Sequence, residues 1–143
     1  MYTVTPVSGA AGGCTGPTFT VTVTLNTKPV IPNQDISVCS GNAFSVPLVN
    51  NPPAVILPAG TTYRWTVVDN PDVNGESDQI SSLTTLSQTL TNTTNVPQVV
   101  IYDVTPGIGN CTGEKFTLTV TVNPAPIIPN QNTSICSGDA FTI

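Results

Sequence analysis

The chain has 143 residues, of which 8% are charged, and a formal net charge of −5 at pH 7. Ordinary soluble domains carry about 25% charged residues, so an architecture of helices with charged outer faces is excluded. Its three cations, Lys28, Arg64 and Lys115, are scattered along the chain and leave no basic surface for nucleic acid or anionic lipid. The apolar runs are too short to span a bilayer, so we expect no direct membrane insertion.

The composition favours strands and turns. The chain contains 24 threonines, 14 prolines and 11 glycines. Threonine and valine suit the half-buried surface of a strand, whereas proline and glycine interrupt strands and form turns. Hydrophobic residues make up 38% of the chain and alternate with polar ones, so we expect it to fold. These features predict an all-β protein.

Several stretches place apolar side chains on one face of an extended chain, which is typical of a strand with one buried side. In chain order they are residues 44–48, 63–67, 86–90, 100–104 and 116–122. Glycines at 107, 109 and 113 predict a loop before the last of them. No stretch has the apolar spacing of a helix. We therefore expect an immunoglobulin-like Greek-key β-sandwich, with Trp65 facing Tyr102 in its core.

The sequence repeats itself. Residues 14–44 align without a gap on residues 111–141, and 20 of these 31 positions are identical. The match continues upstream, where residues 2–6 align on residues 102–106 after a loop that is longer in the first copy. The two cysteines that begin the aligned segments are 97 residues apart, about the size of one immunoglobulin-like sandwich. This pattern predicts tandem repeats.

Proline-bearing stretches at residues 26–29 and 123–126 mark the expected unit boundaries, because proline blocks further ladder bonding at the end of a strand. Residues 30–126 then form one complete repeat. Residues 1–29 correspond to the last hairpin of a preceding repeat, and residues 127–143 to the first strands of a following one. We expect the chain to be a window on a longer array.

Cysteines recur at two fixed places, before the first well-marked inner strand and in the loop before the last strand. This pattern predicts a disulfide and an oxidising, extracellular compartment. The preferred pair is Cys39 with Cys111 inside the complete unit, which leaves Cys14 and Cys136 to partners outside the chain. The alternative is pairing between neighbouring units, because the two cysteine loops lie at opposite ends of a standard sandwich. The chain has no histidine to activate a thiol or to complete a zinc site.

The loop at residues 69–78 gathers four of the eight acidic residues. Oxygen ligands alternate at Asp72, Asn74, Glu76 and Asp78, which is a pattern that calcium favours. The glycine is not where an EF-hand requires it and the terminal glutamate is absent, so a solvated turn is the preferred interpretation and calcium the alternative. A glycosidase pair is disfavoured because nothing places two of these carboxylates across a cleft. No metal or other cofactor is firmly predicted.

Four segments resemble the PKD-like, immunoglobulin-like repeats of very large Bacteroidota surface proteins: VIPNQ…CSGNAF (30–44), GTTYRWTVV (60–68), LTNTT (90–94) and YDVTP…CTG (102–113). In that group such arrays are typically exported by the type IX secretion system, and some members are gliding-motility adhesins. The resemblance implies a PKD-like sandwich at the cell surface. It brings no catalytic residues with it.

The sequence features allow three functions. The preferred one is a non-catalytic structural or adhesive repeat in the stalk of a surface adhesin, with neighbouring repeats as partners and a surface polysaccharide or another cell-surface ligand for the whole protein. The alternative is a carbohydrate-binding or calcium-dependent module of a secreted protein, with the loop at residues 72–78 as its site. A hydrolase is disfavoured, so we expect no enzyme.

Overall fold

The computed structural model describes residues 1–9, 12–140 and 142. Phe141, which closes the sequence repeat, lies outside the described residues. The described residues contain strands and no helix, so none that could cross a membrane. The strands are β1 (Tyr2–Val4), β2 (Phe19–Val21), β3 (Gln34–Cys39), β4 (Thr62–Val68), β5 (Val73–Asn74), β6 (Gln79–Leu83), β7 (Thr91–Asn92), β8 (Gln98–Ile108), β9 (Cys111–Thr112) and β10 (Phe116–Asn123).

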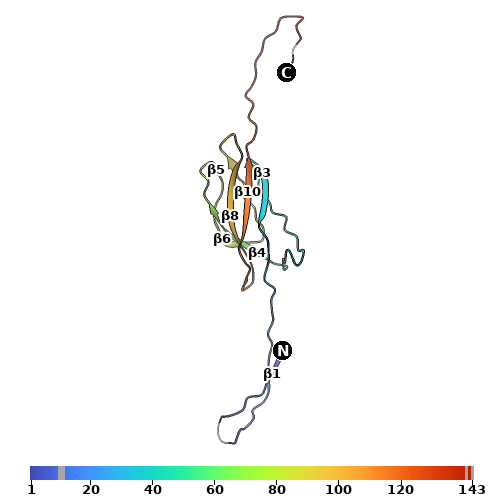
Figure 1. Cartoon of the computed structure of the whole chain (residues 1–143), viewed down its shortest axis with the longest axis vertical. Coiled ribbons are helices and arrows are strands. Elements are labelled where there is room, and N and C mark those ends of the chain that lie inside the picture. The colour runs from blue at the N-terminus through green and yellow to red at the C-terminus, as the bar shows by residue number, and fades with distance from the viewer. Residues whose placement is uncertain (10–11, 141, 143) are drawn as a thin grey trace.

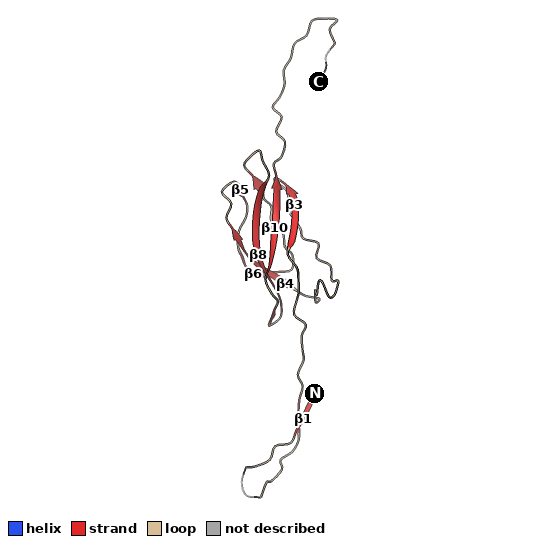
Figure 2. Cartoon of the chain, in the orientation of Figure 1, coloured by secondary structure: helices blue, strands red, loops and turns tan. Residues whose placement is uncertain are grey.

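One main sheet organises the centre of the chain (Figures 1 and 2). Its strands have the order β3-β10-β8-β4-β6, and β9 pairs with the end of β8. The strand β10 runs antiparallel to β8 and parallel to β3, so that Asn123 lies opposite Cys39. We call the end of the sheet at Gln34 and Phe116 the lower end, and the end at Cys39 and Asn123 the upper end.

The inner face of this sheet confirms the alternation expected in β8 and β10. Every second residue of β10 is buried, and Val100, Tyr102 and Val104 are buried in the same phase of β8. Threonines occupy the other phase of β10 and are partly exposed. Tyr63 and Trp65 of β4 are buried as predicted. The alternation of apolar and polar residues therefore predicted the buried face of each central strand correctly.

A second, less regular layer covers this face. It consists of the segment around residues 43–57, the segment 84–90 and the short pair β5–β7. Phe44, Leu86 and Leu90 from this layer pack into the core, and the ring of Phe44 meets Tyr102 at a centroid distance of 5.5 Å. The two layers confirm the predicted all-β class, with sheets that fit an immunoglobulin-like sandwich.

Two predicted strands are wrong in detail. Residues 44–48 form no strand; only the neighbouring Ala43 makes an isolated bridge, to Thr89. Leu86 and Leu90 are core residues, but they lie in an irregular segment before β7. The segment makes isolated backbone hydrogen bonds instead of a continuous ladder: the amide of Gly41 donates to the carbonyl of Leu90 at 2.8 Å, and that of Phe44 to the carbonyl of Gln88 at 3.0 Å. The strands β3 and β6 were not predicted, because their apolar alternation is short.

Two extensions leave the sheet at its opposite ends (Figure 1). The N-terminal extension holds the hairpin β1–β2. Its register reproduces that of β8 with β10: Tyr2 faces Val21 as Tyr102 faces Leu118, and Val4 faces Phe19 as Val104 faces Phe116. The difference is burial, because Tyr2 is 65% exposed whereas Tyr102 is 1% exposed. The hairpin thus has the local structure of β8–β10 without a second layer.

The C-terminal extension repeats local structure from the beginning of the domain. The amide of Asp139 donates to the carbonyl of Cys136 at 3.1 Å, as that of Asn42 donates to Cys39 at 3.1 Å. Gly41 and Gly138 occupy the same left-handed turn position, with φ of 85° and 97°. The sequence repeat therefore produces the same turn whether or not the segment packs against a sheet.

Candidate functional site

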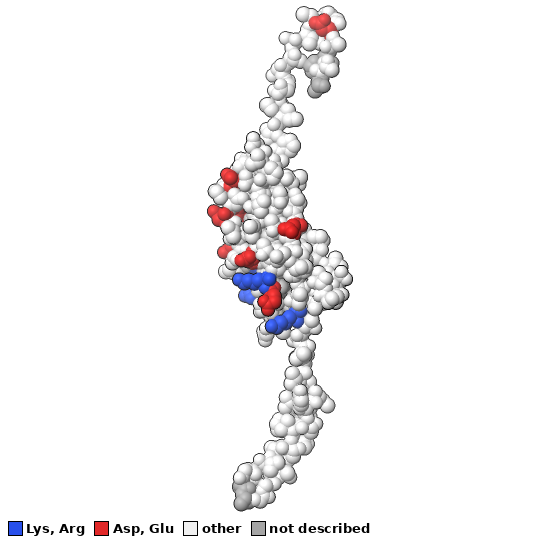
Figure 3. Space-filling model, in the orientation of Figure 1, with Lys and Arg blue, Asp and Glu red and all other residues white. Residues whose placement is uncertain are grey.

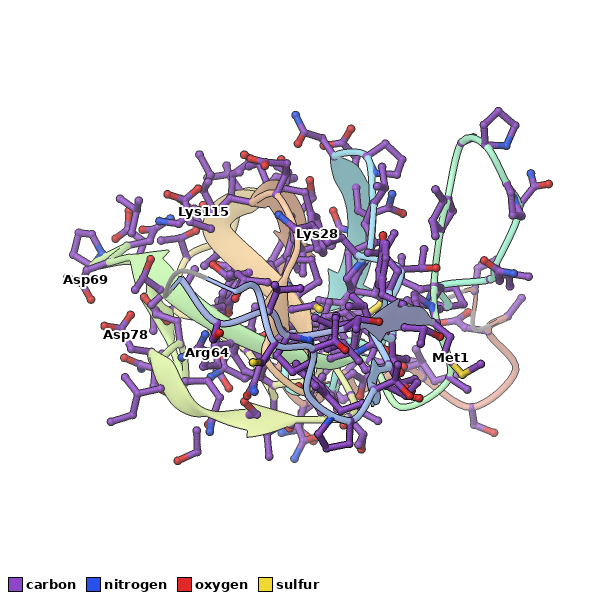
Figure 4. All side chains as sticks on the ribbon, turned by 90° about the horizontal axis from the view of Figure 1, so that it is seen from below. Met1, Lys28, Arg64, Asp69, Asp78 and Lys115 are labelled. Atoms are coloured by element: carbon purple, nitrogen blue, oxygen red, sulfur yellow. The ribbon has the colours of Figure 1, made fainter. Side chains whose placement is uncertain are left out.

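The acidic loop 69–78 follows β4 near the upper end of the sheet. Asp69 and Asp78 lie on one flank of the molecule when it is seen along its long axis (Figure 4). A carboxylate oxygen of Asp78 accepts the amide of Val67 at 2.8 Å, and one of Glu76 accepts the amide of Asn70 at 3.1 Å. These two carboxylates are thus engaged in bracing the loop.

The other predicted calcium ligands point to the same role. The amide of Asp72 donates to the side-chain oxygen of Asn70 at 3.0 Å, which is a local turn motif, and Asn74 belongs to the β5–β7 pair. Over residues 1–9, 12–140 and 142, no three acids, cysteines or histidines are grouped so that they could hold a metal ion. The second oxygen of Glu76 is buried without a hydrogen-bond partner in this described part. These hydrogen bonds brace the loop as a turn.

The aromatic residues are core residues, as predicted, and the polar atoms of Trp65 and Tyr102 have partners. The indole nitrogen of Trp65 donates to the carbonyl of Ser77 at 3.0 Å. The hydroxyl of Tyr102 donates to the side-chain oxygen of Gln88 at 2.9 Å, and the amide nitrogen of Gln88 donates back to Ser77. This chain of bonds ties β4 and β8 to the covering layer. A sugar-stacking platform would need these rings at the surface.

We expect the folded domain to lose stability at high pH because Tyr102 is buried. Burial, and then the negative charge of Glu76, raise the pKa of its phenol well above the usual value. The unfolded chain loses this proton near pH 10, whereas the folded domain keeps it, so the stability is complete below about pH 10 and is lost as pH rises further. Urea unfolding at pH 8 and pH 11, followed by Trp65 fluorescence, measures this loss. Tyr102→Phe should show a smaller loss, and equal losses in both proteins would contradict the assignment.

The cysteines lie where the predicted bond cannot form. Cys39 is at the upper end, beside Asn123, and Cys111 pairs with Ile108 below the lower end of β10. The 11-residue strand β8 lies between the two levels, a separation of about 30 Å, whereas a disulfide requires Cα atoms about 4.4–6.8 Å apart. Both cysteines are free, as are Cys14 and Cys136. The predicted Cys39–Cys111 disulfide within the unit is therefore wrong in this structure.

The cations of the domain lie at one end. Figure 3 shows the lysine and arginine side chains gathered at the lower end, where the chain enters the domain from the N-terminal extension. They are Lys28, Arg64 and Lys115, all exposed. Acidic side chains lie among them and also higher on the domain. The scattered sequence positions of the three cations concealed this grouping.

The domain has two layers, and its main sheet pairs the first strand of the domain, β3, with the last, β10. This architecture agrees with the sequence comparison. Residues 36–126 match the family model for the PKD-like domain. The chain belongs to the PKD-like domain family. Among curated proteins, none matches the chain. PKD-like domains are generally non-catalytic modules and are typically extracellular, which agrees with the coarse class expected from the composition and the repeat.

Two hollows lie on the surface of the PKD-like domain. One, of about 280 Å³, lies beside Tyr63 and is lined by apolar residues, threonines and loop backbone, including Leu57 and Leu86. The other, of about 220 Å³, lies on the outer face of the sheet between Arg64, Asp103 and Lys115. Both are smaller than the range of about 300–1,000 Å³ typical of ligand pockets.

Asn92 makes a dense set of hydrogen bonds in the PKD-like domain and was not predicted from the sequence. It is 8% exposed, and its side-chain nitrogen donates to the carbonyls of Val96 at 2.7 Å and Val122 at 2.9 Å. Its side-chain oxygen accepts the amide and hydroxyl of Thr94, both at 2.8 Å, and its own amide donates to the hydroxyl of Ser40. The sequence signal was weak because asparagine is frequent in this chain.

Proposed function

We propose that the chain is a non-catalytic stalk segment of a large cell-surface adhesin, in which PKD-like units follow one another in tandem. The proposal extends the family membership with two features of the chain. The sequence repeats after 97 residues, and the β1–β2 hairpin has the register of β8–β10. Both features are expected if a second unit precedes the central one.

The observation that carries the proposal is the parallel pairing of the first and last strands of the domain. Because β3 and β10 run in the same direction, the incoming linker reaches the lower end and the outgoing linker leaves from the upper end. Each unit therefore adds its own length to the array. An antiparallel pair would have brought both linkers to one end and folded the array back on itself.

The proposed units are those of the sequence repeat. Residues 30–126 form the complete unit, residues 1–29 end the preceding one, and residues 127–143 begin the next. In the array, the exposed apolar side chains of the β1–β2 hairpin, such as Phe19, would be buried by the rest of their own unit. Their positions correspond to core positions such as Phe116.

The resemblance to Bacteroidota surface repeats supplies the remaining part of the proposal. The parent protein is exported by the type IX secretion system and serves adhesion or gliding at the cell surface. Neighbouring repeats are the direct partners of this segment, and a surface polysaccharide or another surface ligand is bound elsewhere in the protein. Antibodies against residues 30–126 should label intact cells that express the parent protein, and labelling only after lysis would contradict this part.

End-to-end growth can be measured with the chain lengthened by its own repeat. Because residues 127–143 correspond to residues 30–46, appending residues 47–143 after Ile143 completes a second unit with the natural linker. Small-angle X-ray scattering should give a maximum dimension larger by about 35 Å, the length of one eight-residue strand and a three-residue linker at 3.3 Å per residue. An increase in mass without an increase in the maximum dimension would contradict the proposed stalk.

The alternative, a calcium- or carbohydrate-dependent module, makes an opposite prediction for the same chain. Calorimetry with millimolar calcium and with a panel of neutral and acidic glycans should show no binding to the stalk segment. Saturable heat with calcium that Asp72→Asn removes would favour the alternative. Asp35→Asn, an exposed acid on β3, is the matched control.

A further inference from the structure

We infer that consecutive PKD-like units are joined by a disulfide between Cys39 of one unit and the cysteine equivalent to Cys111 in the next unit. This inference rests on the proposed tandem array. It assigns a partner to both cysteine positions of the repeat, neither of which has one inside its own unit. The within-unit bond fails because the two positions lie at opposite ends of the sheet.

Cys39 lies beside the outgoing linker. It is the Cα partner of Asn123, the last residue of β10, and the amide of the next residue, Ser40, donates to the carbonyl of Asn123 at 2.8 Å. The linker therefore starts one strand spacing, about 4.8 Å, from Cys39. Cys39 is also exposed, so its thiol is accessible at the upper end.

Cys111 lies beside the incoming linker. Two residues further on, Gly113 lies so close to the carbonyl oxygen of Pro29 that a methyl group there would overlap it. Gly113 also bonds back to the carbonyl of Pro106 at 2.9 Å, which fixes this contact at the lower end. The short β9 therefore holds Cys111 next to the point where the chain enters the domain.

In consecutive units, the upper end of one unit and the lower end of the next are joined by a short linker. In the next unit, the position of Pro29 is taken by Pro126, three residues after Asn123, and three residues span at most about 10 Å. The cysteine equivalent to Cys111 in that unit lies beside Pro126, and Cys39 lies beside Asn123. A slight bend of the linker is enough to bring two such cysteines to bonding distance.

One feature of the upper end favours this contact. A hollow of about 440 Å³ lies between the loop at residues 93–95 and the outgoing linker, which leaves room for the lower end of the next unit.

The reaction needs an oxidant. As the S–S bond forms, the two thiols give up two protons and two electrons. A disulfide oxidant such as glutathione disulfide accepts them and leaves as two thiols. Outside the cell, the oxidising conditions that stabilise structural disulfides would preserve the bond. The linkage would restrict bending between units and so stiffen the stalk.

The lengthened chain described above tests the inference, because it contains Cys39 and a second copy of Cys111. After treatment with glutathione disulfide and alkylation of free thiols, peptide mapping should find Cys39 joined to the second Cys111. Cys14, the first Cys111 and both copies of Cys136 should remain alkylated. Cys39→Ser should abolish the joined peptide, and Cys136→Ser, the matched control, should leave it unchanged.

Two results would overturn the inference: free thiols at Cys39 and the second Cys111, or a bond between Cys39 and Cys111 of its own unit. The scattering measurement separates this failure from failure of the stalk. An elongated protein with free thiols refutes only the disulfide, whereas a protein that does not lengthen refutes the array itself. The unextended chain under the same oxidant should form no bond between Cys39 and Cys111.

Discussion

Gly75→Ala is expected to destabilise the central domain by about 3 kcal/mol or more, a large part of the roughly 5–15 kcal/mol typical of a domain. Gly75 has a φ of 101°, which side-chain-bearing residues rarely adopt. A methyl group at this position would also overlap the carbonyl oxygen of Thr89. The loop 69–78 approaches the covering layer at this point, so relief of the overlap would displace β5 or the segment before β7.

Urea unfolding followed by the single tryptophan, Trp65, measures the effect. Gly41→Ala is the matched control, because Gly41 also has a positive φ, 85°, and a methyl group there would meet nothing within 4 Å. The free energy of unfolding of the control should fall only by the cost of the backbone conformation, about 1 kcal/mol. Equal losses in the two variants would show that the close approach to Thr89 does not contribute.

Asn92→Asp is expected to be nearly as damaging, at about 3 kcal/mol. The substitution replaces a buried donor by a carboxylate oxygen that faces the carbonyls of Val96 and Val122. Two acceptors would lose their partner, and a negative charge would be buried against them. Because Val122 belongs to β10, the loss should loosen the upper end of the main sheet, where the outgoing linker begins.

Asn95→Asp is the matched control, since it makes the same chemical change at an exposed position three residues after Asn92. It should change the free energy of unfolding by less than about 0.5 kcal/mol. Lowering the pH should partly rescue Asn92→Asp, because a protonated carboxyl can again donate one hydrogen bond. A pH-independent loss, or a loss equal to that of the control, would contradict the role given to Asn92.

The sequence was sufficient to predict the buried side chains where apolar residues occupy every second position of a strand. Phe116, Leu118, Val120 and Val122 alternate with threonines, and all four are buried on the inner face of β10. The aromatic core residues of β4 and β8 were found in the same way. Side chains of a strand point to alternate faces, so the pattern alone specifies the face once the class is known.

The sequence was insufficient where position depends on which strands are neighbours. Leu86 and Leu90 are core residues, yet their segment makes no ladder there, and β3 was missed although it pairs along its whole length with β10. Hydrophobicity reports that a residue is buried, but a ladder also requires a neighbouring backbone in register. Only the tertiary structure supplies that neighbour.

The cysteines show the same division most clearly. The sequence by itself determined the repeat, the all-β class and the recurrence of two cysteines per unit. It did not determine their partners, because spacing along the chain does not say which end of a sheet a residue reaches. The tertiary structure decided this: the parallel pairing of β3 with β10 puts Cys39 and Cys111 at opposite ends of the domain, each beside a linker. Direction along a strand is a property of the ladder, and the ladder forms only when distant segments of the chain pair.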